Sequence, residues 1–201
     1  MKYIAAVCTS FLLTCSIVSV FPNVEECKIY DDVLRLHVIA ESDSEEDQAL
    51  KLKVRDAVLG CVTELVADCG SFDEAYAVVS DNLKEIKTAA VECIKNNGYD
   101  YDLKAELVRE NYPRRDYGAA VIPAGVYNSL KITIGSGEGH NWWCVLFPSI
   151  CTRFASAYGD EYIAAGFTPE EYRIITGEGG VWKVKFRFLE ILSSLKSIVE
   201  N

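Results

Sequence analysis

The spacing of apolar positions changes along the chain, and the change separates extended from helical segments. The stretch VLRLHVIA (33–40) alternates apolar and polar residues and is rich in branched side chains, which is typical of a β-strand. Over 42–70 apolar positions recur every three or four residues, which predicts a helix. Ser44 is its predicted N-cap, with Asp47 three residues later, and Gly70 is its predicted end.

A second long helix is predicted over 71–98. Ser71 and Glu74 have the spacing of a capping box, and Asn97-Gly98 is a typical C-terminal stop. The two helices are expected to pack through broad apolar stripes. In the second helix the stripe consists of Phe72, Ala75, Val79, Leu83, Ile86, Ala90 and Ile94.

The centre of the chain has the pattern of strands. Residues 101–110 alternate, 114–135 contain two strand-like runs around Pro123-Ala124-Gly125, and 141–148 form a further apolar run after the glycine-rich turn 135–139. Three strands joined by such turns predict an antiparallel meander.

The last part of the chain is less regular. Residues 152–180 show no clear period, whereas 184–201 place Phe188, Leu189, Leu192, Leu195 and Val199 at helical spacing, which predicts an amphipathic helix. The predicted fold class is therefore α+β: an antiparallel sheet with two long N-terminal-half helices and a C-terminal amphipathic helix.

The first 21 residues have the pattern of an export signal. Lys2 is followed by an apolar run without charge until Glu25. Because no strong cleavage site follows and the run is long enough to span a bilayer, we expect either a signal peptide or an uncleaved signal anchor over 1–21. A lipid-modified Cys15 is a third option. Residues 22–32 are the predicted linker, and 33–201 are the predicted single domain.

The charge of the chain argues against one class of partner. It has 30 acidic and 20 basic residues, a formal net charge of −10, and few clustered basic side chains, so we expect no nucleic-acid binding. Its cysteine spacing matches no zinc pattern, and only His37 and His140 could complete a site, so we expect no metal and no cofactor.

The segment GHNWWCVLFPSIC (139–151) allows three hypotheses. In the first, Cys144 is a nucleophile with a histidine as base; His140, however, would lie about 13 Å from it along a strand. In the second, the segment is a core strand, and the chain turns back at Phe-Pro-Ser so that Cys144 and Cys151 form a disulfide. In the third, Trp142 and Trp143 point to opposite faces of the strand, and the one that is only half buried anchors a partner.

Three stretches carry a resemblance to a known family. LRLHVIAESDSEEDQALKLKVRDAVL (34–59), IPAGVYNSLKITIGSGEGHNWWCVLFPSIC (122–151) and WKVKFRFLEIL (182–192) together resemble the stage II sporulation protein R family. The resemblance implies a signalling protein, made in the forespore of an endospore-forming bacterium and exported into the space between the forespore and mother-cell membranes. There it would activate a membrane-embedded aspartic protease, which cuts the precursor of the sporulation sigma factor E.

The resemblance implies no enzyme activity, and membrane contact only through the N-terminal segment. The family supplies no firmly placed contact residues, so Asn141, Trp142 and Trp143 are our own candidates for the partner-binding surface, with Cys144–Cys151 as the disulfide that holds it. The alternative function is a secreted hydrolase that acts on the cell wall through Cys144.

Overall fold

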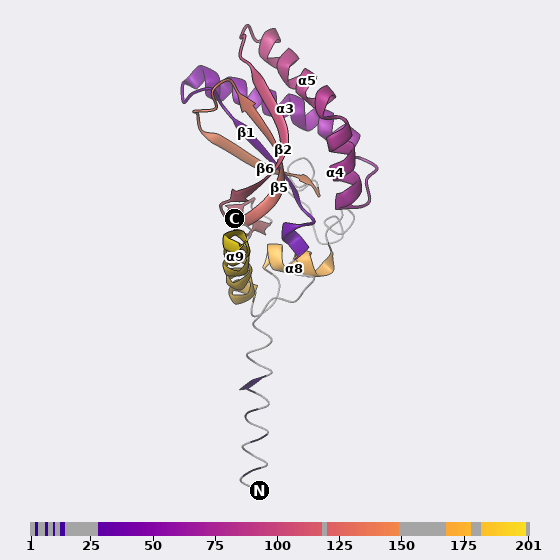
Figure 1. The fold of residues 1–201 in the computed structure, drawn as a ribbon, viewed down its shortest axis with the longest axis vertical. Helices are drawn as coiled ribbons and strands as arrows, with labels where there is room; N and C mark the ends of the chain where they lie inside the picture. Colours follow the sequence, from indigo (N-terminus) through magenta and orange to yellow (C-terminus); the bar gives the residue numbers. More distant parts are fainter. Residues whose placement is uncertain are drawn as a thin grey trace.

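The computed structural model describes residues 28–117, 120–148, 168–177 and 182–199, together with five single positions among the first fourteen (Figure 1). The predicted signal segment 1–21 lies outside the described residues apart from those single positions. Within the described part, no helix is long and apolar enough to cross a membrane.

The predicted first helix is confirmed as α3, Glu45–Leu65. Its N-cap is Ser44, whose side chain accepts a hydrogen bond from the backbone N–H of Asp47, as the sequence predicts. Glu45, Glu46 and Asp47 occupy the first turn, where the positive end of the helix dipole favours carboxylates. Burial of Leu50, Val54, Val58 and Val62 then fixes which face of the helix meets the sheet.

The predicted second helix is wrong in one respect, because it is two helices, α4 (Phe72–Asp81) and α5 (Leu83–Asn96). The Ser71 cap is present, and its side chain accepts from the N–H of Glu74. The break falls at Asn82, whose backbone N–H and side-chain amide both donate to the carbonyl of Val78. Such a side-chain bond competes with the backbone hydrogen bonds of the helix. On both sides of the break, the apolar positions are buried in the same core.

The sheet has four strands in the order β2-β5-β1-β6. Their bounds are Leu103–Tyr112 (β2), Gly125–Ile134 (β5), Leu34–Ile39 (β1) and Asn141–Phe147 (β6). The α+β class is confirmed, but the predicted meander is wrong, because β1 lies between β5 and β6. It runs parallel to β5 and antiparallel to β6. Five of the six β1 residues are buried, which suits a central position better than an edge.

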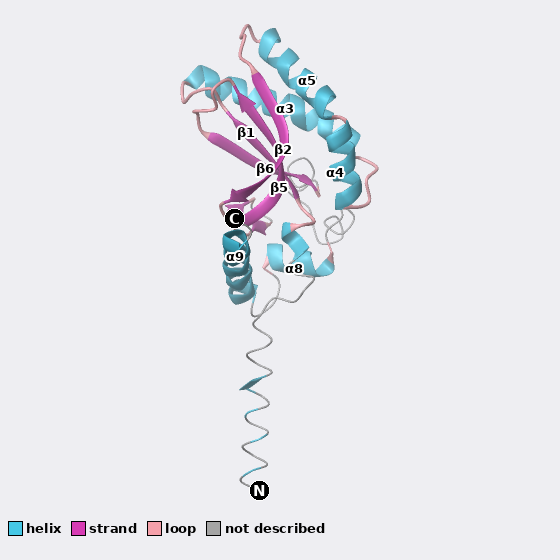
Figure 2. Ribbon diagram, viewed as in Figure 1, coloured by secondary structure: helices cyan, strands magenta, loops and turns pink. Residues whose placement is uncertain are grey.

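The two faces of the sheet have different coverings (Figure 2). One face packs against α3, α4 and α5 around a core that includes Leu36, Val38 and Leu130. The other face bears a second, smaller core built around Tyr112, Tyr127 and Val145. A short ladder beside it pairs β3 (Arg115–Asp116) with β4 (Val121–Ile122).

The second core also holds residues that the sequence analysis assigned to the linker. The 3-10 helix η1, Lys28–Tyr30, buries Ile29 and Tyr30 there. Gly125 allows this approach, because a Cβ on it would lie 2.3 Å from the Tyr30 ring and 2.5 Å from the hydroxyl of Ser193. The folded part of the chain therefore includes at least residues 28–32 of the predicted linker.

Two helices lie together beside this core, α8 (Pro169–Thr176) and α9 (Trp182–Val199) (Figure 1). The expectation of irregular structure throughout 152–180 is wrong at α8, which begins with a complete capping box between Thr168 and Glu171 and has Pro169 at its start. The predicted C-terminal helix is confirmed as α9. Its predicted apolar stripe is divided, however, because Leu189 is buried while Leu192 and Leu195 are exposed.

Candidate recognition surface

The candidate partner-binding residues lie at the start of β6, an outer strand of the sheet. Asn141 is exposed, and Trp142 and Trp143 are each partly buried. Trp142 packs against the helix-side core and Trp143 against the second core, so the two rings lie on opposite faces, as the alternation of a strand predicts.

Each tryptophan is overlaid by an arginine. The guanidinium carbon of Arg55 in α3 lies 4.8 Å from the centre of the Trp142 ring, and that of Arg115 in β3 lies 4.1 Å from the centre of the Trp143 ring. Both distances are within the range of cation–π attraction. The strand therefore presents a similar aromatic and cationic pair on each of its faces.

A chain of polar contacts crosses the whole sheet from Asn141. Its side-chain oxygen lies 2.7 Å from Nε2 of His37 in β1, and Nδ1 of His37 lies 2.9 Å from the Glu110 carboxylate in β2. Lys131 in β5 lies 3.4 Å from the other oxygen of Glu110, and the hydroxyl of Tyr112 donates to Glu110 at 3.2 Å. All four strands thus contribute to one polar row.

Glu110 is the charged centre of this row. Burial raises the pKa of its carboxyl group, but the hydrogen bond and charge of His37, with the charge of Lys131, outweigh burial and lower the pKa to about 2. Glu110 is therefore ionised at any physiological pH. Its charge holds His37, and through His37 the side chain of Asn141, in a fixed position.

Arg35 lies beside this row and is completely buried. Its Nε donates to the carbonyl of Cys144 at 3.1 Å, and Nη2 donates to the hydroxyl of Tyr117 at 2.9 Å. The guanidinium also lies over the rings of Tyr112 and Tyr127, at 4.2 and 5.1 Å from their centres. The bond to Cys144 connects β1 to the backbone of β6 at the residue that follows Trp143.

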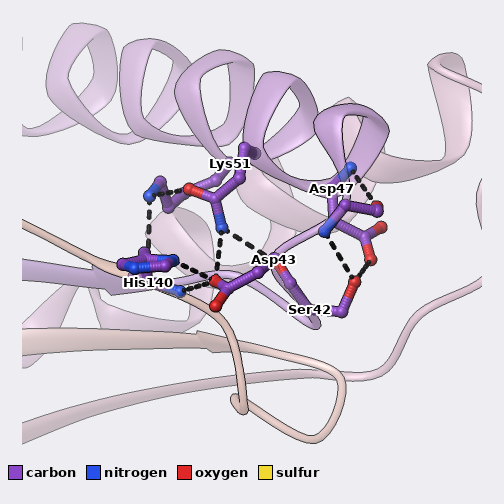
Figure 3. Close-up of polar contacts among 7 residues, drawn as sticks. Ser42, Asp43, Asp47, Lys51 and His140 are labelled. Carbon is purple, nitrogen blue, oxygen red and sulfur yellow. Dashed lines mark hydrogen bonds and ion pairs between the residues drawn. The ribbon is translucent and has the colours of Figure 1, made fainter.

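A second group of polar contacts fixes the chain just before β6 (Figure 3). Lys51 in α3 donates to the backbone carbonyl of His140 at 2.9 Å, and the backbone N–H of His140 donates to Asp43 at 2.6 Å. The His140 ring also contacts the Asp43 carboxylate. Asp43 lies just before α3. Its neighbour Ser42 donates a hydrogen bond from its hydroxyl to the carboxylate of Asp47, in the first turn of α3, at 2.5 Å. Asp43, just before α3, and Lys51, within α3, thus position the residue that immediately precedes β6.

The cysteines differ in state. Cys144 is completely buried and is one half of a disulfide, whereas Cys61, Cys69 and Cys93 are free thiols. Burial is the main cause that raises the pKa of each free thiol. Cys151 lies outside the described residues, so its pairing with Cys144 stays a prediction. The hydrogen-bond partners of the two histidines are other residues: His140 is bonded to Asp43, and His37 to Glu110 and Asn141.

The partners of Asn141 were not among the residues predicted from the sequence. Arg35 and His37 interrupt the apolar strand LRLHVI at alternate positions, a spacing that places both side chains on one face of the sheet. The alternation does not identify Glu110 or Asn141 as the groups that contact His37.

Within the described residues, no group of histidine, cysteine, aspartate and glutamate side chains has an arrangement that could hold a metal ion.

Comparison with known proteins identifies the family. The family model described as stage II sporulation protein R matches residues 30–158, which contain the whole sheet and helices α3 to α5. The chain belongs to the stage II sporulation protein R family.

A curated relative supports this. The chain is 42% identical over 123 residues to the stage II sporulation protein R of Bacillus subtilis (strain 168). That stretch is 61% of this chain and 55% of the relative, so the chain spans about half the length of the curated relative it matches. No solved structure matches the chain. The resemblance noted for 182–192 lies beyond the residues that the family model matches.

Proposed function

We propose that this stage II sporulation protein R family member is an exported signalling protein of endospore formation. It binds and activates a membrane-embedded aspartic protease, and so triggers processing of the sigma-E precursor. The observation that supports this most strongly is the family match over residues 30–158. The N-terminal segment 1–21, with its apolar run, is the proposed route of export into the space between the forespore and mother-cell membranes.

The state of Cys144 favours binding over catalysis. A nucleophilic cysteine needs an accessible thiolate and a base beside it. Cys144 is completely buried and oxidised, and both histidines have other partners. These observations give no support to the alternative hydrolase function.

The proposed binding surface is the start of β6 with its two arginines. Asn141 is exposed and held by His37, and Trp142 and Trp143 lie half buried beneath Arg55 and Arg115. Tryptophan and arginine are the residues that most often dominate the binding energy of protein interfaces. Because their positions are already fixed, little conformational entropy is lost when a partner binds. The proposed disulfide between Cys144 and Cys151 would hold the end of the same strand.

The test is a reconstitution in a bacterium that does not sporulate. This chain, the protease and the sigma-E precursor are expressed together, and cleavage of the precursor is followed by its change in size. Cleavage that requires this chain, and is lost when residues 1–21 are deleted, supports an activating ligand that acts after export. Absence of cleavage, with all three proteins folded and this chain exported, contradicts the proposed partner.

The binding surface is tested in the same host with matched variants. Asn141→Ala, alone and with Trp142→Ala, is expected to reduce cleavage at least about tenfold, since central interface residues contribute roughly 2 kcal/mol or more. Asn111→Ala is the control, because Asn111 is also an exposed strand asparagine but lies on β2. Full cleavage with both Asn141 variants at normal protein levels would leave the function standing and place the surface elsewhere.

A further inference from the structure

Helix α9 has two faces with different roles. Its inner face is fixed to the sheet: Glu190 and Ser193 accept hydrogen bonds from the backbone N–H groups of Ala124 and Val126, each at 3.2 Å, and Leu189 is completely buried. These contacts account for the attachment of the helix to the domain. On its other face, the large apolar side chains that the structure describes as exposed are Ile191, Leu192 and Leu195.

That outer face is apolar. Ile191, Leu192 and Leu195 are 48%, 45% and 55% exposed, and their helical spacing places them side by side. Among the described residues from Lys28 onward, the other large apolar side chain exposed to a similar degree is Leu52 in α3, at 40%. Exposed large apolar side chains are therefore concentrated on this one helix, which usually marks an interaction site.

The charge of α9 is opposite to that of the chain. Its sequence contains Lys183, Lys185, Arg187 and Lys196, against the single acidic residue Glu190, while the chain as a whole has a formal net charge of −10. Glu190 is buried and accepts a hydrogen bond from Arg187 at 2.7 Å, and the sequence of the helix as a whole carries a net positive charge. A helix with an exposed apolar face and flanking lysines has the composition of one that lies on an anionic bilayer.

We propose that α9 lies on the surface of an anionic lipid bilayer. Ile191, Leu192 and Leu195 enter the boundary between headgroups and acyl chains, and the lysines of the helix contact the anionic headgroups. The inner face stays bonded to β5, so the helix orients the whole sheet relative to the membrane. This contact is independent of the proposed function and adds a second membrane contact to the one expected from the N-terminal segment.

The test measures the helix locally, since the N-terminal segment would hold the full chain on any vesicle. The full chain is reconstituted in vesicles of phosphatidylcholine, or of phosphatidylcholine with an equal part of phosphatidylglycerol, and amide hydrogen exchange of 182–199 is followed. Exchange is expected to be at least about fivefold slower on the anionic vesicles, the factor expected for one basic residue near such a surface. The difference should decrease near 1 M salt, where the screening length is roughly 3 Å.

Two variants complete the design. Ile191→Glu with Leu195→Glu is expected to abolish the slowing, whereas Leu52→Glu, the same kind of change at an exposed residue of α3, is expected to retain it. Unchanged exchange in β5 shows that each variant is folded. Equal exchange of α9 on both kinds of vesicle, or slowing that survives the double variant, overturns the proposal. Slowing that requires added protease would assign the face to a protein partner and would also overturn it.

Discussion

Nδ1 of His37 lies 2.9 Å from the carboxylate of Glu110, although the two residues are 73 positions apart in sequence and belong to strands that do not pair with each other. The contact passes over β5, which separates β1 from β2. It joins an edge of the sheet to its centre through side chains alone. The position of Asn141 at the other edge depends on it.

Replacing His37 should therefore destabilise the protein. His37→Ala leaves Glu110 partly buried with Lys131 as its remaining charged partner, and we expect the free energy of unfolding to fall by about 2–3 kcal/mol. His140→Ala is the matched control, because that ring is exposed and its pair with Asp43 is worth at most about 1 kcal/mol. Denaturant unfolding of both variants measures the difference. Equal losses would show that the His37 contact contributes no more than a surface pair.

The low pKa of Glu110 predicts how stability depends on acid. Its carboxyl group has a pKa of about 2 in the folded state, against 4.5 as its ordinary value, so the folded state binds this proton less tightly than the unfolded state. Its contribution is complete above pH 4.5 and is lost as the pH falls toward 2. The difference in stability between the native chain and Glu110→Gln should shrink over that range. A difference that stays constant from pH 5 to 2 would contradict this assignment.

The cysteines should separate into two chemical groups. The raised pKa values of Cys61, Cys69 and Cys93 predict slow alkylation at neutral pH, and Cys144 should not react until the protein is both reduced and unfolded. Mass spectrometry of peptides from the unreduced protein should show Cys144 linked to Cys151. A link from Cys144 to another cysteine would disprove that pairing. Rapid alkylation of Cys144 in the native protein would favour the hydrolase alternative.

Two glycines should respond oppositely to the same substitution. Gly125→Ala places a Cβ against the Tyr30 ring and the Ser193 hydroxyl, so we expect a loss of stability of about 1–3 kcal/mol. Gly60→Ala adds a methyl group inside α3 where no atom lies within 4 Å, and should stabilise the protein by roughly 0.5–1 kcal/mol. Thermal unfolding of both variants shows whether each substitution lowers or raises the stability of the protein. A stable Gly125→Ala protein would mean that η1 and α9 move apart at little cost.

The local elements were predictable where the sequence contains complete local signals. Ser44 and Ser71 identified two helix starts, because a cap is a contact between residues three apart. The Thr168–Glu171 capping box was equally readable but was missed within a stretch of weak periodicity. The break at Asn82 was not visible, since it depends on how both helices meet a shared core.

Strand order and the site required information that a single sequence does not contain. Alternation identifies a strand and its two faces, and it correctly separated Trp142 from Trp143. It does not state which strands pair, so the insertion of β1 between β5 and β6 was not predicted. The row Asn141–His37–Glu110 follows from that register, and therefore could not be foreseen either.

The central place of β1 also determines when the sheet can form during synthesis. Leu36 is made early, but its neighbours on either side are Leu130 and Cys144. The ribosome must release nearly three quarters of the chain before the first strand has both partners, whereas α3, α4 and α5 can form from local contacts. The nascent chain therefore has a prolonged interval without its native sheet, which is the state that the proposed export of the chain would require.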